Sequence, residues 1–93
     1  MKYIIVKVRG SEQAIVFGDV LSHADVAKPY LQCRRDIVAA GFCSISWDRE
    51  GEFLQTSAYG ESESIKQAFS GEVPHTAREE DADLIRITLD LNR

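Results

Sequence analysis

Residues 2–17, KYIIVKVRGSEQAIVF, contain the clearest structural pattern in the sequence. Side chains of Lys2–Val8 alternate between two faces, and this period of two is typical of a β-strand. Arg9–Glu12 has the composition of a turn, and Ala14–Phe17 is a second run of residues that favour strands. Two such runs joined by a short turn that contains glycine predict an antiparallel β-hairpin.

A second hairpin is predicted in the middle of the chain. Phe42–Trp47 alternates cleanly, Asp48–Gly51 has turn composition, and Phe53–Tyr59 is the partner strand. The mixed alternation of Phe53–Tyr59 is typical of an edge or a half-exposed strand. This run also lacks the lysine or proline that usually protects an edge strand. A place inside the sheet, with neighbours on both sides, is the open alternative.

The first predicted helix begins after Ser22. A serine followed by an acid three residues later, here Asp25, has the spacing of a capping box. Pro29 then either kinks the helix or opens a second helical segment. Beyond it, Ile37–Ala40 fits two alternatives, because its apolar residues continue a helical spacing but also favour a strand that starts at Ile37.

A second helix is predicted to start at about Ala77, since Thr76–Glu79 repeats the capping spacing and acidic residues follow. Ile85–Leu91 is open between helix and strand, because its apolar residues alternate with period two while the capping signal favours a helix through at least Ile85. The alternation of acids and serines in Glu61–Ser64 predicts a solvated strand face. Together these elements predict one α+β domain over residues 1–93, an antiparallel sheet built from two hairpins with two helical segments packed on one face.

Composition excludes several classes of protein. Eleven Lys and Arg against fifteen Asp and Glu give a net charge of −4, which disfavours nucleic acid and anionic membranes as partners. The apolar runs are far shorter than the roughly 20 residues of a membrane span, so we expect a cytoplasmic protein with no membrane association. Two cysteines in such a protein are expected to be reduced thiols. We expect no metal and no cofactor, since the four residues of zinc-ligand type lack the close pairs of a structural site: His23, Cys33, Cys43 and His75.

Four short motifs resemble, in their order along the chain, a group of small bacterial and phage or prophage proteins of unknown function. They are Ser22–Val26, Ala40–Phe42, Gly60–Ile65 and Glu79–Ile85, and the resemblance covers roughly the last three-quarters of the chain. Proteins of that group often introduce the acidic stretch with Arg-Pro, whereas this chain has Ala77-Arg78-Glu79 there. The resemblance implies a similar fold and genome context, and it implies no chemistry.

The candidate pocket residues are His23, Asp25, Ser44 and Ser62. His23 stands beside a serine and an acid, but catalytic triads usually gather from separate elements, and helix capping explains this cluster. The sequence therefore favours a non-enzymatic accessory or protein-interaction module, with an unknown protein partner or weak self-association. The alternative is a small enzyme with a pocket near His23.

Overall fold

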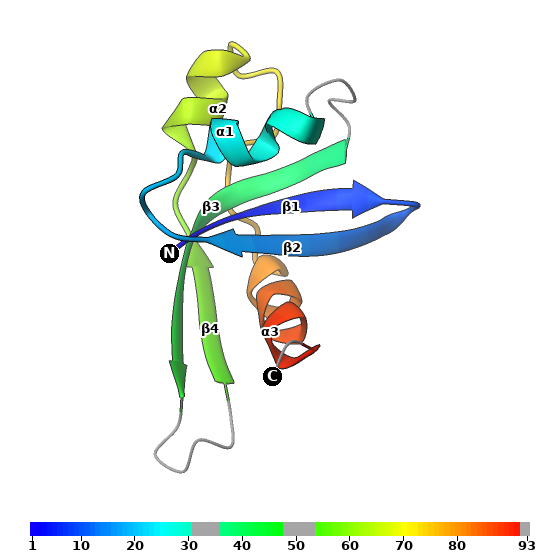
Figure 1. The fold of residues 1–93 in the computed structure, drawn as a ribbon, viewed down its shortest axis with the longest axis vertical. Helices are drawn as coiled ribbons and strands as arrows, with labels where there is room; N and C mark the ends of the chain where they lie inside the picture. The colour runs from blue at the N-terminus through cyan, green and yellow to red at the C-terminus, as the bar shows by residue number, and fades with distance from the viewer. Residues whose placement is uncertain (31–35, 48–53, 92–93) are drawn as a thin grey trace.

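A computed structural model describes residues 1–30, 36–47 and 54–91 of the chain. Four strands form one antiparallel sheet in the order β2-β1-β3-β4 (Figure 1). The predicted α+β fold with an antiparallel sheet is confirmed. The elements are β1 (Lys2–Val8), β2 (Ser11–Phe17), α1 (His23–Ala27), the 3₁₀ helix η1 (Lys28–Tyr30), β3 (Ile37–Trp47), β4 (Leu54–Tyr59), α2 (Glu63–Ala68) and α3 (Asp81–Leu91).

The first predicted hairpin is confirmed. β1 pairs with β2 along its whole length, and Val8 lies opposite Ser11 across a two-residue turn. The turn residues Arg9 and Gly10 have φ of 51° and 81°. Positive φ at both positions is the conformation of a type I′ turn, whose twist matches that of the two strands.

β3 changes its partner along its length. Residues 37–42 pair with β1, and residues 42–47 pair with β4. The second half of β3 and the whole of β4 form a two-stranded ribbon that extends away from the short helices (Figure 1); we call residues 42–47 and 54–59 the β3–β4 arm. Its strands confirm the second predicted hairpin, whose turn at 48–51 lies outside the described residues. In the part of the chain that the structure describes, β4 pairs only with β3 and is an edge strand, so the alternative that placed it inside the sheet is wrong.

A β-bulge explains why residues 37–40 also fitted a helix. Ile5 pairs with Ala39 and Val6 pairs with Ile37, which leaves Val38 as the extra residue. Because of this extra residue, Ile37 and Ala40 lie on the same face of the sheet although they are three positions apart. A spacing of three imitates a helix, and the strand alternative is correct.

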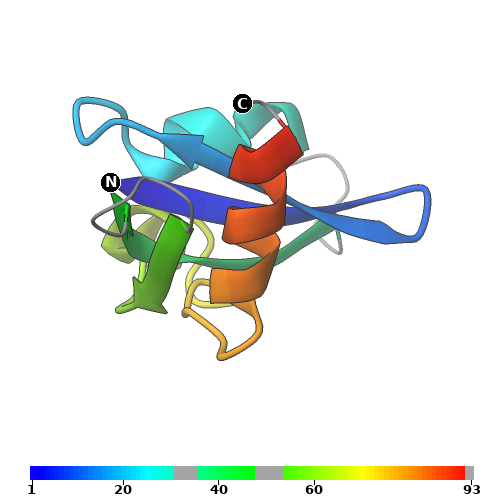
Figure 2. The same cartoon turned by 90° about the horizontal axis from the view of Figure 1, so that it is seen from below.

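Helices cover both faces of the sheet, whereas the sequence predicted the helices after Ser22 and near Ala77 on one face. Ala27 of α1 and Ile65 of α2 pack on one face against Ile4 and Val6, whereas Ile85 of α3 packs on the opposite face. α3 lies across the strands when the molecule is viewed from below (Figure 2). β1 is therefore buried on both sides, including Tyr3, Ile4, Ile5 and Val6. No described helix is long and apolar enough to cross a membrane.

The helix starts differ in part from the predictions. Ser22 caps α1 as predicted, accepting a hydrogen bond from the Asp25 amide at 3.1 Å. α1 ends before Pro29, which lies in η1. The strand predicted at Glu61–Ser64 is wrong beyond Glu61, because the buried Ser62 hydroxyl accepts the Ile65 amide and starts α2.

The second predicted helix starts later than expected. α3 begins at Asp81 and not near Ala77, and it continues to Leu91, so Ile85–Leu91 is helical. Ile85 and Leu89 pack against the sheet, while the side chain of Ile87 is 48% exposed. The half-exposed Ile87, which lies between two residues that pack on the sheet, therefore produced the misleading alternation with period two.

Candidate functional site

His23 is enclosed by the fold. Its ring meets Phe17 and Phe42 edge-on, with centroid distances of 5.5 and 5.3 Å. Its Nε2 donates a hydrogen bond of 2.7 Å to the carbonyl oxygen of Gly41, and the residue is 3% exposed. Burial lowers the pKa of the imidazole below its ordinary value of 6.5, although the hydrogen bond to Gly41 acts in the other direction. His23 is therefore a neutral side chain that packs α1 against the sheet.

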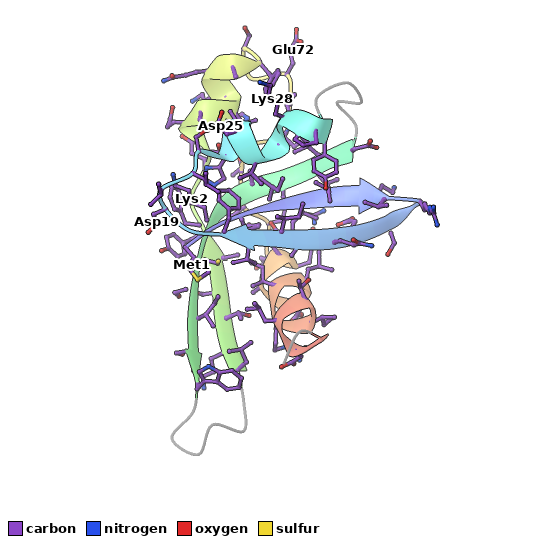
Figure 3. The ribbon with its side chains drawn as sticks, in the orientation of Figure 1. Met1, Lys2, Asp19, Asp25, Lys28 and Glu72 are labelled. Carbon is purple, nitrogen blue, oxygen red and sulfur yellow. The ribbon has the colours of Figure 1, made fainter. Side chains whose placement is uncertain are left out.

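The other sequence-predicted candidates do not gather around His23. Asp25 lies in the first turn of α1 with an exposed side chain (Figure 3). Ser44 is exposed on the β3–β4 arm, where its hydroxyl contacts that of Ser57. Ser62 is buried at the start of α2, and its neighbour Ser64 accepts a hydrogen bond from the amide of Ala24 at 3.1 Å. The starts of α1 and α2 are therefore joined by the hydrogen bond from Ala24 to Ser64.

A buried network of polar side chains lies on the opposite face of the sheet. Asp81 is fully buried, and its carboxylate accepts hydrogen bonds from the Tyr3 hydroxyl at 2.6 Å and from the Arg78 amide at 2.8 Å. The guanidinium of Arg78 donates to Asp81 at 2.9 Å and to Glu12 at 2.6 Å. The network joins β1 and β2 to the start of α3.

The electrostatics of this network follow from burial and charge pairing. Burial raises the pKa of the Tyr3 hydroxyl, and its hydrogen bond to Asp81 acts in the same direction. The hydrogen bond from Arg78 lowers the pKa of Glu12, and the same bond raises the pKa of Arg78. No buried side-chain nitrogen or oxygen among the described residues lacks a hydrogen-bond partner.

Sequence reasoning missed this network. Glu12 and Arg78 are 66 positions apart, so no local pattern joins them. Tyr3 did carry a signal in the sequence. It belongs to the apolar run YIIV, which is typical of a strand buried on both faces, and a buried hydroxyl needs a hydrogen-bond partner. The spacing of three between Arg78 and Asp81 at a helix start carried another.

An open groove of about 440 Å³ lies between β2 and α3. Its α3 wall includes the half-exposed Ile87, and its β2 wall includes Glu12, which the network holds through Arg78. The volume lies within the range of small-ligand sites in proteins. The groove is lined by Ser11, Glu12, Gln13, Ala14, Leu84, Ile87 and Thr88.

The backbone of β2 faces this groove with open hydrogen-bonding groups. Met1 exchanges two backbone hydrogen bonds with Cys43, so the backbone groups of Met1 point toward β3. Strand residues alternate in this respect, so Ser11 and Gln13 bond to β1 while Glu12 and Ala14 point away from it. β2 is an edge of the sheet as the structure describes it. The groove therefore lies beside a strand edge that can accept another strand.

The N-terminal residues contact the segment between β2 and α1. The Met1 ammonium lies 3.6 Å from Asp19, and Lys2 Nζ donates to the carbonyl of Leu21 at 2.9 Å (Figure 3). Cys43 beside them is a buried free thiol, and burial raises its pKa. Within residues 1–30, 36–47 and 54–91, no three His, Cys, Asp or Glu side chains are grouped to hold a metal; Cys33 lies outside these ranges.

Comparisons with protein-family models, with curated proteins and with solved structures found no match to this chain.

Proposed function

We propose that the protein is a non-enzymatic interaction module that binds an extended peptide segment along β2, in the groove between β2 and α3. The observation that carries the proposal is the coincidence of two features. The outward-facing backbone groups of Glu12 and Ala14 lie beside a groove whose other wall is the C-terminal helix. Addition of a strand to a sheet edge is a general mode of peptide recognition, in which backbone bonds give affinity and side-chain pockets give specificity.

The lining of the groove indicates the chemistry of the peptide. Alternate side chains of an added strand would point toward α3 and pack on Leu84 and Ile87. Glu12 is already held by Arg78, so it does not call for a basic partner residue. We therefore expect ligands with small or apolar side chains at every second position. The net charge of −4 argues against nucleic acid as the partner. The cytoplasmic location and the phage or prophage origin stay predictions from the sequence.

Selection from a displayed peptide library tests this function. Enriched peptides should alternate apolar residues, and titration monitored by NMR should shift the amide signals of Glu12 and Ala14 and those around Ile87. Ile87→Glu should weaken binding of the enriched peptide at least about tenfold, because it puts a charge on the apolar wall. Gln55→Glu is the matched control, since it adds the same charge to an exposed site on the opposite edge strand.

The backbone contribution is tested on the peptide itself. Methylation of the peptide amides that pair with β2 should abolish binding, whereas methylation of the alternate amides should not. Binding that survives both Ile87→Glu and every single amide methylation would exclude strand addition in this groove.

A further inference from the structure

The opposite edge of the sheet, strand β4, has a sequence that is complementary to itself. We propose that two copies of the chain associate by antiparallel pairing of their β4 strands, with Thr56 opposite its own counterpart. This contact uses a different edge from the peptide groove and does not depend on the proposed function.

The backbone of β4 provides the bonding groups for this contact. The backbone groups of Cys43 point toward Met1, so those of its neighbours Phe42 and Ser44 point toward β4. Phe42 pairs with Tyr59 and Ser44 pairs with Ser57. Leu54, Thr56 and Ala58 therefore point their amides and carbonyls to the open side of β4. Among the described residues the sheet order places no further strand there.

The composition of β4 leaves this edge without the usual protection. Natural edge strands commonly carry lysine, proline or an inward-pointing charge. Leu54–Tyr59, LQTSAY, contains none of these. Two copies of a strand without charges bring no like charges together at the contact. The net charge of −4 is spread over the rest of the chain, and salt screens it beyond roughly 8 Å.

The register follows from the outward-facing residues. In an antiparallel pair, residues that point toward the partner must face one another. Centring the pair on Thr56 satisfies this for all three outward-facing residues, since Leu54 then meets Ala58 on both sides of the two-fold axis. Registers displaced by two residues, centred on Gln55 or Ser57, match only two outward-facing residues per strand.

The side chains also match in the Thr56-centred register. Leu54 and Ala58 lie on the face covered by α3, so an apolar residue meets an apolar residue there. Gln55 meets Ser57 on the other face, where both are exposed and line a polar hollow of about 190 Å³. Cross-strand pairs of this kind stabilise sheets, and like charges placed directly opposite destabilise them. The same pattern that permits self-pairing thus fixes its register.

Sedimentation equilibrium tests the pairing with two variants, one with proline and one with valine at position 56. Wild type should form a dimer, and Thr56→Pro should be monomeric with an unchanged far-ultraviolet dichroism spectrum, because it removes an outward amide. Thr56→Val is the matched control: it also loses the hydrogen bond from Thr56 to the Ala82 carbonyl but keeps the amide, and it should stay dimeric. A wild-type protein that is monomeric at every concentration would overturn the proposal.

A charge exchange tests the pairing of the β4 strands and does not depend on whether the proline variant folds. The pair Gln55→Lys with Ser57→Lys places lysine opposite lysine, so this variant should be monomeric. Gln55→Glu with Ser57→Glu should be monomeric for the same reason. Mixing the two variants should restore a heterodimer. Either double variant dimerising like wild type, or a mixture that stays monomeric, would exclude the Thr56-centred register.

Discussion

Two polar side chains are buried on opposite faces of the same sheet, and the fold satisfies them in different ways. His23 is a neutral ring between two phenyl rings, and one hydrogen bond to Gly41 suffices for it. Asp81 is a fully buried acidic side chain held by Tyr3 and by the backbone and side chain of Arg78. The comparison shows that the free-energy cost of burying a polar side chain depends strongly on its charge. A buried charge needs several hydrogen-bond partners, whereas a neutral group needs one.

His23 and Asp81, which we call the neutral and the charged anchor, both act on the same point of the sheet. The Gly41 carbonyl accepts the bond from His23, and Tyr3, which reaches Asp81, lies opposite Gly41 in the register of β1 and β3. A Cβ at Gly41 would lie 2.8 Å from the Tyr59 carbonyl oxygen and 3.1 Å from the Cβ of Ala77. The position where β3 passes from one partner strand to the other is therefore packed from both faces.

Removing the charged anchor should have the largest effect. Asp81→Ala leaves the Tyr3 hydroxyl unpaired and Arg78 without its buried partner. Loss of one member of a buried ion pair costs about 3–5 kcal/mol, and Arg78 is partly exposed, so we expect the lower end of that range. Urea denaturation followed by circular dichroism measures the change. Asp81→Leu combined with Arg78→Met should cost less than the sum of the single changes, and strict additivity would contradict the coupling.

The shared point between the anchors should come next. Gly41→Ala should destabilise the protein by about 1–3 kcal/mol, because the contact at 2.8 Å is with backbone and cannot be relieved by a side-chain rotation. Gly18→Ala is the control, since a Cβ there meets nothing within 4 Å, and it should change stability by less than about 0.5 kcal/mol. Equal denaturation midpoints for the two variants would mean that Gly41 has room to move.

The sequence predicted those features of the fold that rest on neighbouring residues. The first hairpin follows from alternation and from Arg9-Gly10, and α1 follows from the cap at Ser22. α2 was missed because Ser62 sits in an alternating acidic run, where the buried environment that makes it a cap is invisible. The bulge at Val38 was missed because an extra residue in a strand changes the period without a composition signal.

The candidate site was less accessible to sequence reasoning than the fold. His23 stood out as a polar residue at a helix start, but its ring partners lie on two separate strands. The groove arises from residues 11–14 and 84–88, which only packing brings together. The edge character of β4 was within reach, because an unprotected strand shows in composition alone.

The burial of His23, the neutral anchor, should make the stability of the protein depend on pH. Burial lowers the pKa of His23 in the folded protein, so protonation favours the unfolded chain. Stability should be complete above the ordinary value of 6.5 and should fall as the pH drops below it, by at most about 1.4 kcal/mol per pH unit for one proton. Denaturation between pH 7.5 and 5 checks this (roughly the window in which histidine titrates). His23→Phe should flatten the curve.

Glu12, which is bonded to Arg78 on the same face of the sheet as Asp81, responds at lower pH. The pKa of Glu12 is held down by its bond to Arg78, so its contribution should be lost only below the ordinary value of 4.5. A second decline of stability below that pH, absent in Glu12→Gln, would separate the two faces of the sheet by their titration. A single decline that His23→Phe leaves unchanged would instead assign the whole effect to carboxylates.

The smallest effect is expected at the cap that starts the helix of His23. Ser22 accepts the Asp25 amide at 3.1 Å, and its loss in Ser22→Ala should cost about 1 kcal/mol. Ser22→Gly is the matched control, because replacing a capping serine by glycine costs only a few tenths of a kcal/mol. If Ser22→Ala also reduced the pH dependence assigned to His23, the cap would be positioning the ring as well as starting the helix. Coincident denaturation midpoints for Ser22→Ala and wild type would show that the ring contacts of His23 with Phe17 and Phe42 hold α1 without its cap.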